Sequence, residues 1–387
     1  MPDITAPVDA LALLKTLIAF PSITPETAGV LDHLQSVLLA LGFEVFRPHF
    51  EGDGSYPVDN LFATRGAGGR HLLFAGHTDV VPPGNPAAWT HPPFAATEAD
   101  GRLYGRGAAD MKSGIAAFVA AAAAVIAAGE GDNGRLSLAI TNDEEADAIN
   151  GTEKLMAWAK ERGHRFDFAI VGEPSSSATV GDSIKIGRRG SLNGEITVTG
   201  VQGHVAYPDK AKNPLPLLAG IVSALSGPLD SGSAAFPPSN LEFTSIDVGN
   251  AVSNVIPGSA KARFNVRYND RWTPETLATH LREQLARLAG SAAGLTVLGR
   301  PSRSFLSPTG GGIELLAEMI AAETGRRPDF STAGGTSDAR FIAPYCPVAE
   351  LGIVGPSMHK VDEHIDLADL AALTHLYRRF ITLFLAG

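Results

Sequence analysis

The chain has 387 residues, of which 44% are hydrophobic and 19% charged, which predicts a globular protein with a large core and two domains. Its formal net charge of −10 argues against a nucleic-acid partner, because a polyanion would be repelled. The single cysteine, Cys346, lies in an apolar, strand-like run and excludes both an internal disulfide and a cysteine-rich zinc site.

The first residues, MPDITAPVDALALLKTLIAF, predict an amphipathic helix over residues 8–19. A signal peptide is disfavoured, because Asp3 and Asp9 come early and no basic region precedes the apolar residues. The longest apolar stretch, residues 114–129, is rich in alanine and falls short of the roughly 20 residues that span a membrane. We therefore expect a soluble, cytoplasmic protein that makes no membrane contact.

The first half of the chain alternates helices and apolar strands. After the first helix, the pattern predicts helix 29–41, strands 43–48, 59–65 and 71–76, the Ala-rich helix, strand 135–141, helix 151–162 and strand 167–171. Such alternation is typical of an α/β domain in which helices cover both faces of a mixed sheet.

The pattern changes near Gly187. Residues 191–200 and 260–270 alternate apolar and polar side chains, which predicts antiparallel strands with one face in water. Strand 241–248 and helices 214–226 and 274–289 belong to the same region, and for the whole insert we expect an α+β sandwich of four antiparallel strands, these three among them, and two helices.

The α/β pattern returns with helix 312–324, strand 347–353 and helix 366–385. We therefore expect a discontinuous catalytic domain, residues 1–187 and 301–387, interrupted by a smaller domain over residues 188–300.

The stretch FAGHTDVVP, residues 74–82, ends a predicted strand with His77 and Asp79. Strand side chains alternate, so both are expected on one face. An isolated pair of this kind is more often a strand-end histidine followed by a turn carboxylate. The alternative is that His77 binds a metal ion and Asp79 supports the imidazole through its second nitrogen.

Five more acidic or imidazole residues follow predicted strands or precede the Ala-rich helix: Asp110, Glu144, Glu145, Glu173 and His359. Taken singly, each could be a helix cap or a turn residue. In an open α/β sheet, however, the carboxyl ends of the strands form the ligand crevice, so these groups are expected to converge. Because the carboxylates would repel one another without a ligand, the set predicts two zinc ions with one bridging carboxylate. Adjacent side chains diverge, so one glutamate of the 144–145 pair can ligate while the other acts as a general base.

Nine segments, in order and over nearly the whole chain, resemble the M20 metallopeptidase family: GHTDVVP, GRGAADMKSG, NDEEADAINGT, VGEPSS, GRRGSLNGEITVTGVQGHVAYP, SNVIPG, FNVR, GGTSDARFIA and MHKVDEH. The resemblance implies that His77 and Glu173 bind one zinc ion. It implies that Glu145 and His359 bind the other and that Asp110 bridges the two. Co²⁺ is expected to substitute for Zn²⁺.

The same resemblance assigns the remaining roles at the metal centre. Glu144 would be the base that activates the attacking water and later the acid that protonates the leaving amine. Asp79 would orient His77.

The resemblance also implies that the inserted domain forms a homodimer. His204, in QGHVAYP, would then reach the partner's active site and stabilise the oxyanion, with Asn254 as a second donor. From spacing alone, His204 would be an ordinary turn histidine.

The basic residues Arg188, Arg189 and Arg267 lie in these motifs, although surface arginines usually only solvate a protein. A guanidinium matches a carboxylate bidentately, so Arg188 and Arg267 are predicted to clamp the carboxylates of a small anionic N-acyl amino acid. Their candidate neighbours in the substrate site are Ser191, Tyr207 and Thr336.

Within this resemblance, the segments GRRGSL, QGHVAYP, FPPS and GGTSDARF imply a narrower activity, the hydrolysis of N-succinyl-LL-2,6-diaminopimelate in diaminopimelate and lysine biosynthesis. Alternatives within the family are an acetylornithine deacetylase, an aminoacylase and a glutamate-releasing carboxypeptidase. A non-catalytic binding homologue is disfavoured because Glu144 is present, and a nucleotide-binding protein because no P-loop is found. One departure concerns specificity, since GPSMHK places Gly355 where the family commonly carries an Asn-containing segment. Another is the loop ADAINGT, where a GPAIDGT-like form is more usual.

Overall fold

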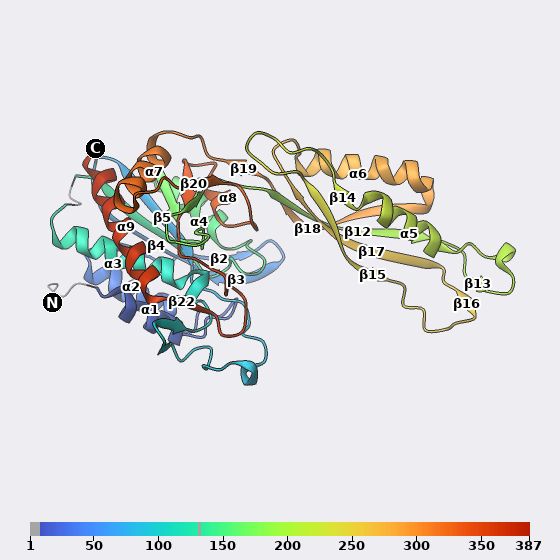
Figure 1. Ribbon diagram of the computed structural model, residues 1–387, viewed down its shortest axis with the longest axis horizontal. Coiled ribbons are helices and arrows are strands. Elements are labelled where there is room, and N and C mark those ends of the chain that lie inside the picture. Colours follow the sequence, from blue (N-terminus) through green and yellow to red (C-terminus); the bar gives the residue numbers. More distant parts are fainter. Residues whose placement is uncertain (1–7, 131–132) are drawn as a thin grey trace. The chain divides into compact units, whose positions relative to one another are not determined.

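The structure, a computed structural model, describes residues 8–130 and 133–387 (Figure 1). The chain forms two compact units. The first comprises the described residues up to Ile186 together with Ser307–Ser331 and Ser337–Gly387. The second comprises Gly187–Leu306 and Thr332–Thr336.

The predicted end of the inserted domain at residue 300 falls too early. β18 (Ala293–Ser302) continues past it, and β19 (Phe305–Leu306) pairs with β11 (Gly187–Arg188) at the start of the same unit. The sequence also gave no sign that Thr332–Thr336 returns to the second unit. There the Thr332 hydroxyl donates to the Ala235 carbonyl at 2.6 Å.

The first unit is built on an eight-stranded mixed sheet. In sheet order its strands are β1 (Glu44–Phe46), β4 (Leu61–Gly66), β8 (Arg135–Thr141), β5 (His71–His77), β9 (Phe168–Val171), β21 (Val348–Glu350), β10 (Ser183–Lys185) and β20 (Asp329–Ser331). The four central strands β8, β5, β9 and β21 run parallel, whereas β1 and β4 run antiparallel to their neighbours. Smaller ladders join β2 (His49–Gly52) to β3 (Ser55–Asp59), and β6 (Thr97–Ala99) to β7 (Arg102–Tyr104) and β22 (His364–Asp366).

Helices cover both faces of this sheet, as the alternating pattern predicts (Figure 1). One face packs against α1 (Ala10–Ala19), α2 (Val30–Ala40), α3 (Ser113–Ala127), α7 (Gly311–Thr324) and α9 (Leu367–Ala386). Along β5, Leu72 and Phe74 enter that core, so Leu73 and Ala75 point to the opposite face. The helices α4 (Thr152–Glu161) and α8 (Ala339–Ile342) contact each other and the sheet on that other side.

The Ala-rich helix lies at the centre of the first unit. The stretch Ala108–Ala127 is long and apolar enough to cross a membrane by length and composition alone, but 89% of that window is buried inside the protein. The chain also bends at Asp110 and Met111, whose backbone angles are not helical, so the regular helix begins only at Ser113. This bend places Asp110 apart from the helix that follows it.

The second unit has a fully antiparallel sheet with the strand order β14 (Gly227–Pro228), β15 (Asn240–Asp247), β17 (Ser259–Tyr268), β12 (Gly190–Thr199) and β18. The sheet therefore has five strands instead of the predicted four, because the two-residue β14 carries no readable period. The helices α5 (Pro214–Leu225) and α6 (Pro274–Ala289) cover one face of the sheet. Along β17, Ala262, Phe264 and Val266 are buried beneath these helices while Lys261 and Arg263 are exposed, so the other face is in water.

Candidate metal centre

Four adjacent parallel strands of the first unit bring the predicted ligands to one edge of the sheet. His77 is the last residue of β5, and the Glu144–Glu145 pair follows the end of β8. Glu173 follows the end of β9, and His359 lies in the segment after β21. Because the carboxyl ends of parallel strands meet at one edge, side chains far apart in the sequence converge there.

Two histidines share the carboxylate of Asp110. The Nε2 atom of His77 lies 3.2 Å from Asp110 Oδ1 and 3.5 Å from Glu173 Oε1. The Nε2 atom of His359 lies 3.3 Å from Asp110 Oδ2 and 3.1 Å from Glu145 Oε1. Each triad offers one ligand atom per residue, all within 4.8 Å of one another. The two oxygens of Asp110 thus face two different sets of donors, as a bridging ligand requires.

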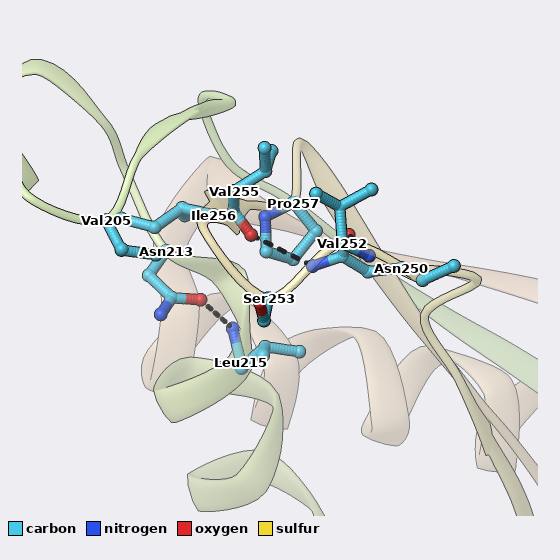
Figure 2. Close-up of a pocket in the computed structure, with 10 residues that line it drawn as sticks. Val205, Asn213, Leu215, Asn250, Val252, Ser253, Val255, Ile256 and Pro257 are labelled. Carbon is cyan, nitrogen blue, oxygen red and sulfur yellow. Dashed lines mark hydrogen bonds between the residues drawn. The ribbon is translucent and has the colours of Figure 1, made fainter.

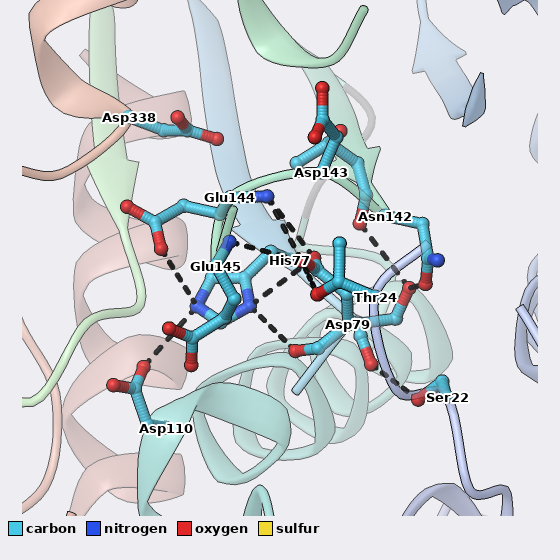
Figure 3. Close-up of polar contacts among 12 residues, drawn as sticks. Ser22, Thr24, His77, Asp79, Asp110, Asn142, Asp143, Glu144, Glu145 and Asp338 are labelled. Atoms are coloured by element: carbon cyan, nitrogen blue, oxygen red, sulfur yellow. Dashed lines mark hydrogen bonds and ion pairs between the residues drawn. The ribbon is translucent and has the colours of Figure 1, made fainter. Parts of the chain in front are cut away.

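The adjacent glutamates diverge, as expected from their spacing (Figure 3). Glu145 reaches His359, whereas Glu144 Oε2 points toward His77 and stays 4.0 Å from its Nε2 atom. Glu144 therefore approaches His77 but belongs to neither of the candidate ligand groups.

Glycines allow the ligand-bearing segments to approach closely. A Cβ atom added at Gly114, in the first turn of α3, would lie 2.3 Å from the carbonyl oxygen of Gly172. A Cβ atom added at Gly352 would lie 2.2 Å from the carbonyl oxygen of Glu173. Both distances are shorter than any real Cβ contact, so the main chain on either side of Glu173 can pack this tightly only against glycine.

Asp79 was predicted to orient His77. In the structure the main-chain carbonyl of Asp79, and not its carboxylate, lies within hydrogen-bond distance of the His77 ring. The Nδ1 atom of His77 lies 3.0 Å from the main-chain carbonyl of Asp79, but 3.6 Å from its carboxylate. The carboxylate instead accepts the main-chain N–H groups of Glu144 and Glu145 at 3.1 and 3.0 Å, and the Thr24 hydroxyl at 2.8 Å. Because β5 ends at His77, the strand alternation no longer applies at Asp79. Asp79 therefore holds the loop that carries the glutamate pair.

A second buried carboxylate in this loop was not identified from the sequence. Asp143 accepts the N–H groups of Ala148, Ile149 and Asn150 at 2.9–3.2 Å and the Tyr56 hydroxyl at 2.5 Å. Its position immediately before the glutamate pair in NDEEADAINGT was the available signal. Two carboxylates thus hold the main chain of the loop: Asp79 accepts the N–H groups of Glu144 and Glu145, and Asp143 accepts those of residues 148–150.

The electrostatics of the centre favour protons or cations between its carboxylates. Hydrogen bonds that the His359 ring donates to the carboxylates of Asp110 and Glu145 raise the pKa of His359 to about 10. Burial opposes the charge on His77, but its neighbours Asp110 and Glu173 outweigh burial and hold the pKa of His77 well above its ordinary value. The same two imidazoles keep the pKa of Asp110 far below its usual range despite burial.

Two other carboxylates, those of Glu173 and Glu144, resist ionisation. Burial raises the pKa of Glu173 to about 7, with a contribution from the charge of Asp110. Burial and the charges of Glu173 and Asp338 raise the pKa of Glu144 well above its ordinary value. A cluster of hard oxygen donors and two imidazoles that cannot all ionise unaided fits a pair of divalent cations, with Asp110 between them.

In the second unit, four predicted substrate residues lie near one another. Arg267 on β17 is directly opposite Ser191 on β12, and both lie on the face away from the helices. Arg188 is buried, and its Nη1 atom donates to the carbonyl of Gly335 at 3.0 Å, next to Thr336. Arg188 thus anchors the segment 332–336, a contact that the sequence did not indicate.

The other three predicted residues lie at the opposite end of the same unit. His204 is on β13 (Gly203–His204), which pairs with β16 (Val255–Ile256) just after Asn254. Tyr207 is 59% exposed, and its ring centroid is 5.7 Å from that of His204. The ten-residue strand β17 separates this end from Arg267 by about 30 Å at 3.3 Å per residue.

A hollow of about 400 Å³ adjoins this end of the second unit (Figure 2). Val205, Val252 and Pro257 line it together with Asn250, which donates to the carbonyl of Val255 at 2.9 Å. Val205 and Val252 are 45% and 51% exposed, so this end presents apolar side chains to its surroundings.

The fold and this centre define the class of protein: the chain belongs to the peptidase family M20/M25/M40, which its sequence matches over residues 73–383. Over 375 residues it is 53% identical to the succinyl-diaminopimelate desuccinylase of Methylorubrum populi, covering 96% of this chain and 97% of that protein.

Solved structures show the same fold. The M20 family metallo-carboxypeptidase Sso-CP2 of Sulfolobus solfataricus superposes with a TM-score of 0.79 at 17% identity, covering 98% of this chain and 100% of the other. The Bacillus subtilis YXEP protein, a dinuclear metal binding peptidase from the M20 family, gives a TM-score of 0.71 at 14% identity, covering 97% and 98%.

Proposed function

We propose that this protein is a zinc-dependent amide hydrolase that converts N-succinyl-LL-2,6-diaminopimelate and water to succinate and LL-2,6-diaminopimelate. The observation that supports this most strongly is the pair of ligand triads that share Asp110, in a chain 53% identical to a desuccinylase over nearly its full length. The reaction belongs to diaminopimelate and lysine synthesis, and we expect the protein in the cytoplasm.

His77 and Glu173 would hold one zinc ion, Glu145 and His359 the other, and Asp110 would contact both. When bound, the two ions supply Lewis-acid polarisation of the amide carbonyl and lower the pKa of the attacking water. The main-chain carbonyl of Asp79 accepts from Nδ1 of His77, which leaves Nε2 of that ring free to ligate.

Glu144 moves the protons of the reaction. Its carboxylate accepts a proton from the water that adds to the succinyl carbonyl carbon, and it later delivers that proton to the amine nitrogen when the C–N bond breaks. The raised pKa of Glu144, caused by burial and neighbouring carboxylates, makes this side chain a ready proton acceptor. Asp79 keeps Glu144 in place through the main-chain N–H groups of the loop.

The substrate carries three carboxylates, which Arg267 and Arg188 would bind. Arg267 lies on the water-facing side of its sheet opposite Ser191 and is only partly buried. Arg188 would act together with the segment that it anchors, including Thr336. Position 355 is a glycine and offers the substrate no side chain. A Cβ atom there would lie 2.7 Å from Cβ of Pro174, so a larger residue would not fit without a shift.

We further propose a homodimer formed through the second unit. The outer edge of β15 is paired with β14 only at Asn240 and Leu241 within the described chain, and Ile246 on that strand is 56% exposed. An unpaired strand edge with exposed apolar residues is a natural place for a second copy to bind. In this dimer, His204 and Asn254 of one copy would stabilise the oxyanion at the metal centre of the other.

The dimer proposal is tested by mixing two inactive variants, Glu144→Gln and His204→Ala. If His204 serves the other copy, each mixed dimer regains one intact site, and the mixture should recover about a quarter of wild-type activity. If His204 acts within its own chain, mixing restores nothing.

The substrate is tested by offering the zinc-loaded protein N-succinyl-LL-2,6-diaminopimelate and, separately, N-acetylornithine, each with a chelator control. We expect chelator-sensitive release of succinate and no hydrolysis of the acetyl compound. Turnover of N-acetylornithine alone would retain the metal chemistry and overturn the proposed substrate.

A further inference from the structure

Glu363 is a completely buried carboxylate that no role described so far uses. Its Oε1 atom accepts the main-chain N–H of Asp110 at 3.1 Å and that of Ala109 at 2.8 Å. Its Oε2 atom accepts from Nη1 of Arg106 at 2.6 Å, and Arg106 is itself only 3% exposed. One side chain therefore binds the main chain of the bridging ligand and carries its own counter-charge.

Glu363 belongs to the loop that carries His359. The neighbouring Asp362 fixes the same loop by accepting the N–H and the hydroxyl of Thr90, each at 2.8 Å. His359 and Asp362 both have positive φ angles, 62° and 55°, which residues with a side chain rarely adopt. A backbone in this region persists only where surrounding contacts hold it, and the loop has such contacts on both sides.

Arg106 connects this arrangement to a third loop. Its guanidinium lies 5.2 Å from the ring centroid of Trp89, and the Trp89 indole donates to the carbonyl of Pro83 at 2.9 Å. Pro83 follows the strand that ends at His77. The buried pair thus lies among segments that carry His77, Asp110 and His359.

We propose that Glu363, neutralised by Arg106, is a positioning residue that sets the separation of Asp110 and His359. The side chains of these two residues approach to 3.3 Å, and they lie in separate loops that the Glu363 carboxylate joins directly. The pair therefore tunes the affinity of the metal position formed by Asp110, Glu145 and His359. This inference rests on the two-metal centre proposed above and is independent of the substrate.

Zn²⁺ titration of the metal-free full-length protein tests this inference, with Glu363→Gln as the principal variant. The variant keeps the shape of the side chain, but it loses the charge and turns an amide N–H₂ toward either Arg106 or the main-chain donors. We expect two zinc ions to bind the variant. The position formed by Asp110, Glu145 and His359 should bind about 10–100-fold more weakly, the usual cost of losing an outer partner of a metal ligand, and the other position, which shares only Asp110 with it, should lose less.

Asp230→Asn is the matched control. Asp230 also accepts two main-chain N–H groups, of Gly232 at 2.8 Å and Ser239 at 3.1 Å, but it lies in the second unit. We expect this control to lower the unfolding temperature and to leave both zinc affinities unchanged.

If Glu363→Gln lowers the unfolding temperature while both zinc affinities stay at the wild-type values, Glu363 is only a stabilising residue and the inference is wrong. If that variant does not fold, the double variant Arg106→Gln/Glu363→Gln replaces the ion pair with a neutral hydrogen-bonded pair and carries the same expectation. Fewer than two zinc ions on the wild type would instead refute the metal centre itself.

Discussion

Most candidate site residues of the first unit are buried, whereas most of those in the second are not; the exceptions are the exposed His359 and the buried Arg188. In the first, His77, Asp79 and Asp110 are at most 6% exposed, and each is fixed by several neighbours. In the second, Arg267 lies on the water-facing side of a sheet and Tyr207 is 59% exposed. The difference indicates that hydrolysis and substrate choice can be changed separately: substitutions in the first unit should alter kcat and zinc binding, and substitution of the proposed carboxylate-binding arginines in the second should alter KM.

The largest effect is expected for Glu144→Gln. This change removes the proton acceptor without removing a ligand, so kcat should fall by about 10²–10⁴-fold while zinc content stays at the wild-type level. Succinate release and bound zinc are measured on the same sample, with the exposed Glu161→Gln as the control. Nearly full activity in Glu144→Gln would show that the base has been assigned wrongly.

A smaller loss is expected for Asp79→Asn. The asparagine offers one acceptor where three donors converge, and its own N–H₂ group would face them. The loop with the glutamate pair should shift, and kcat should fall by about 10–100-fold. Thr24→Val removes a single hydrogen bond to the same carboxylate and should reduce kcat only a few-fold. An equal loss in both variants would contradict the role given to the Asp79 carboxylate.

Arg267→Met should change KM, whereas the two preceding substitutions change kcat. A hydrogen bond to a charged group contributes about 1.5–3 kcal/mol, so losing this guanidinium should lower kcat/KM by about 10–100-fold, mainly through KM. Zinc affinity should be unaltered, since Arg267 lies in the second unit. Steady-state kinetics with the succinyl substrate distinguish this result from a loss of kcat, which would remove the separation between the units.

The last effect concerns the pH dependence of zinc affinity and leaves the residues of the chain unchanged. In the metal-free chain the pKa of His359 is about 10, above its ordinary value of 6.5, so the ring is protonated below that pH. Zinc must displace this proton, and zinc affinity should therefore rise about tenfold per pH unit per displaced proton as the pH increases toward 10. Calorimetric titration in buffers of different ionisation enthalpy counts the protons released, and His359→Gln should release one fewer. No proton release on zinc binding would contradict the ion pairs of the metal-free centre.

The fold was largely predictable, because the spacing of apolar residues along a strand or helix shows which of its faces is buried. The strand 135–141 coincides with β8, and helix 274–289 coincides with α6, since each has a clear apolar period. The convergence of His77, Glu173 and the Glu144–Glu145 pair was also predictable, because residues at the ends of parallel strands meet at one edge of the sheet, whereas Asp110 comes from the segment before α3.

The contacts that hold these ligands could not be predicted. Asp79 lies beyond the end of β5, where alternation no longer says which way a side chain points, and its carboxylate binds the main chain of a loop 65 residues away. Glu363 lies in the segment MHKVDEH, but it binds the main-chain N–H groups of Ala109 and Asp110. Nearly every residue has such a group, so the sequence does not indicate this contact. The return of segment 332–336 to the second unit likewise depends on a main-chain carbonyl, that of Gly335, which carries no sequence signal.

The central claim is that one chain holds two zinc ions through Asp110. It is tested most directly by titrating the metal-free wild-type protein with Zn²⁺ and counting the ions bound per chain. The account predicts two, with hydrolysis of the succinyl substrate appearing as they bind. A chain that binds one zinc ion or none, and yet hydrolyses this substrate in the presence of chelator, would contradict it.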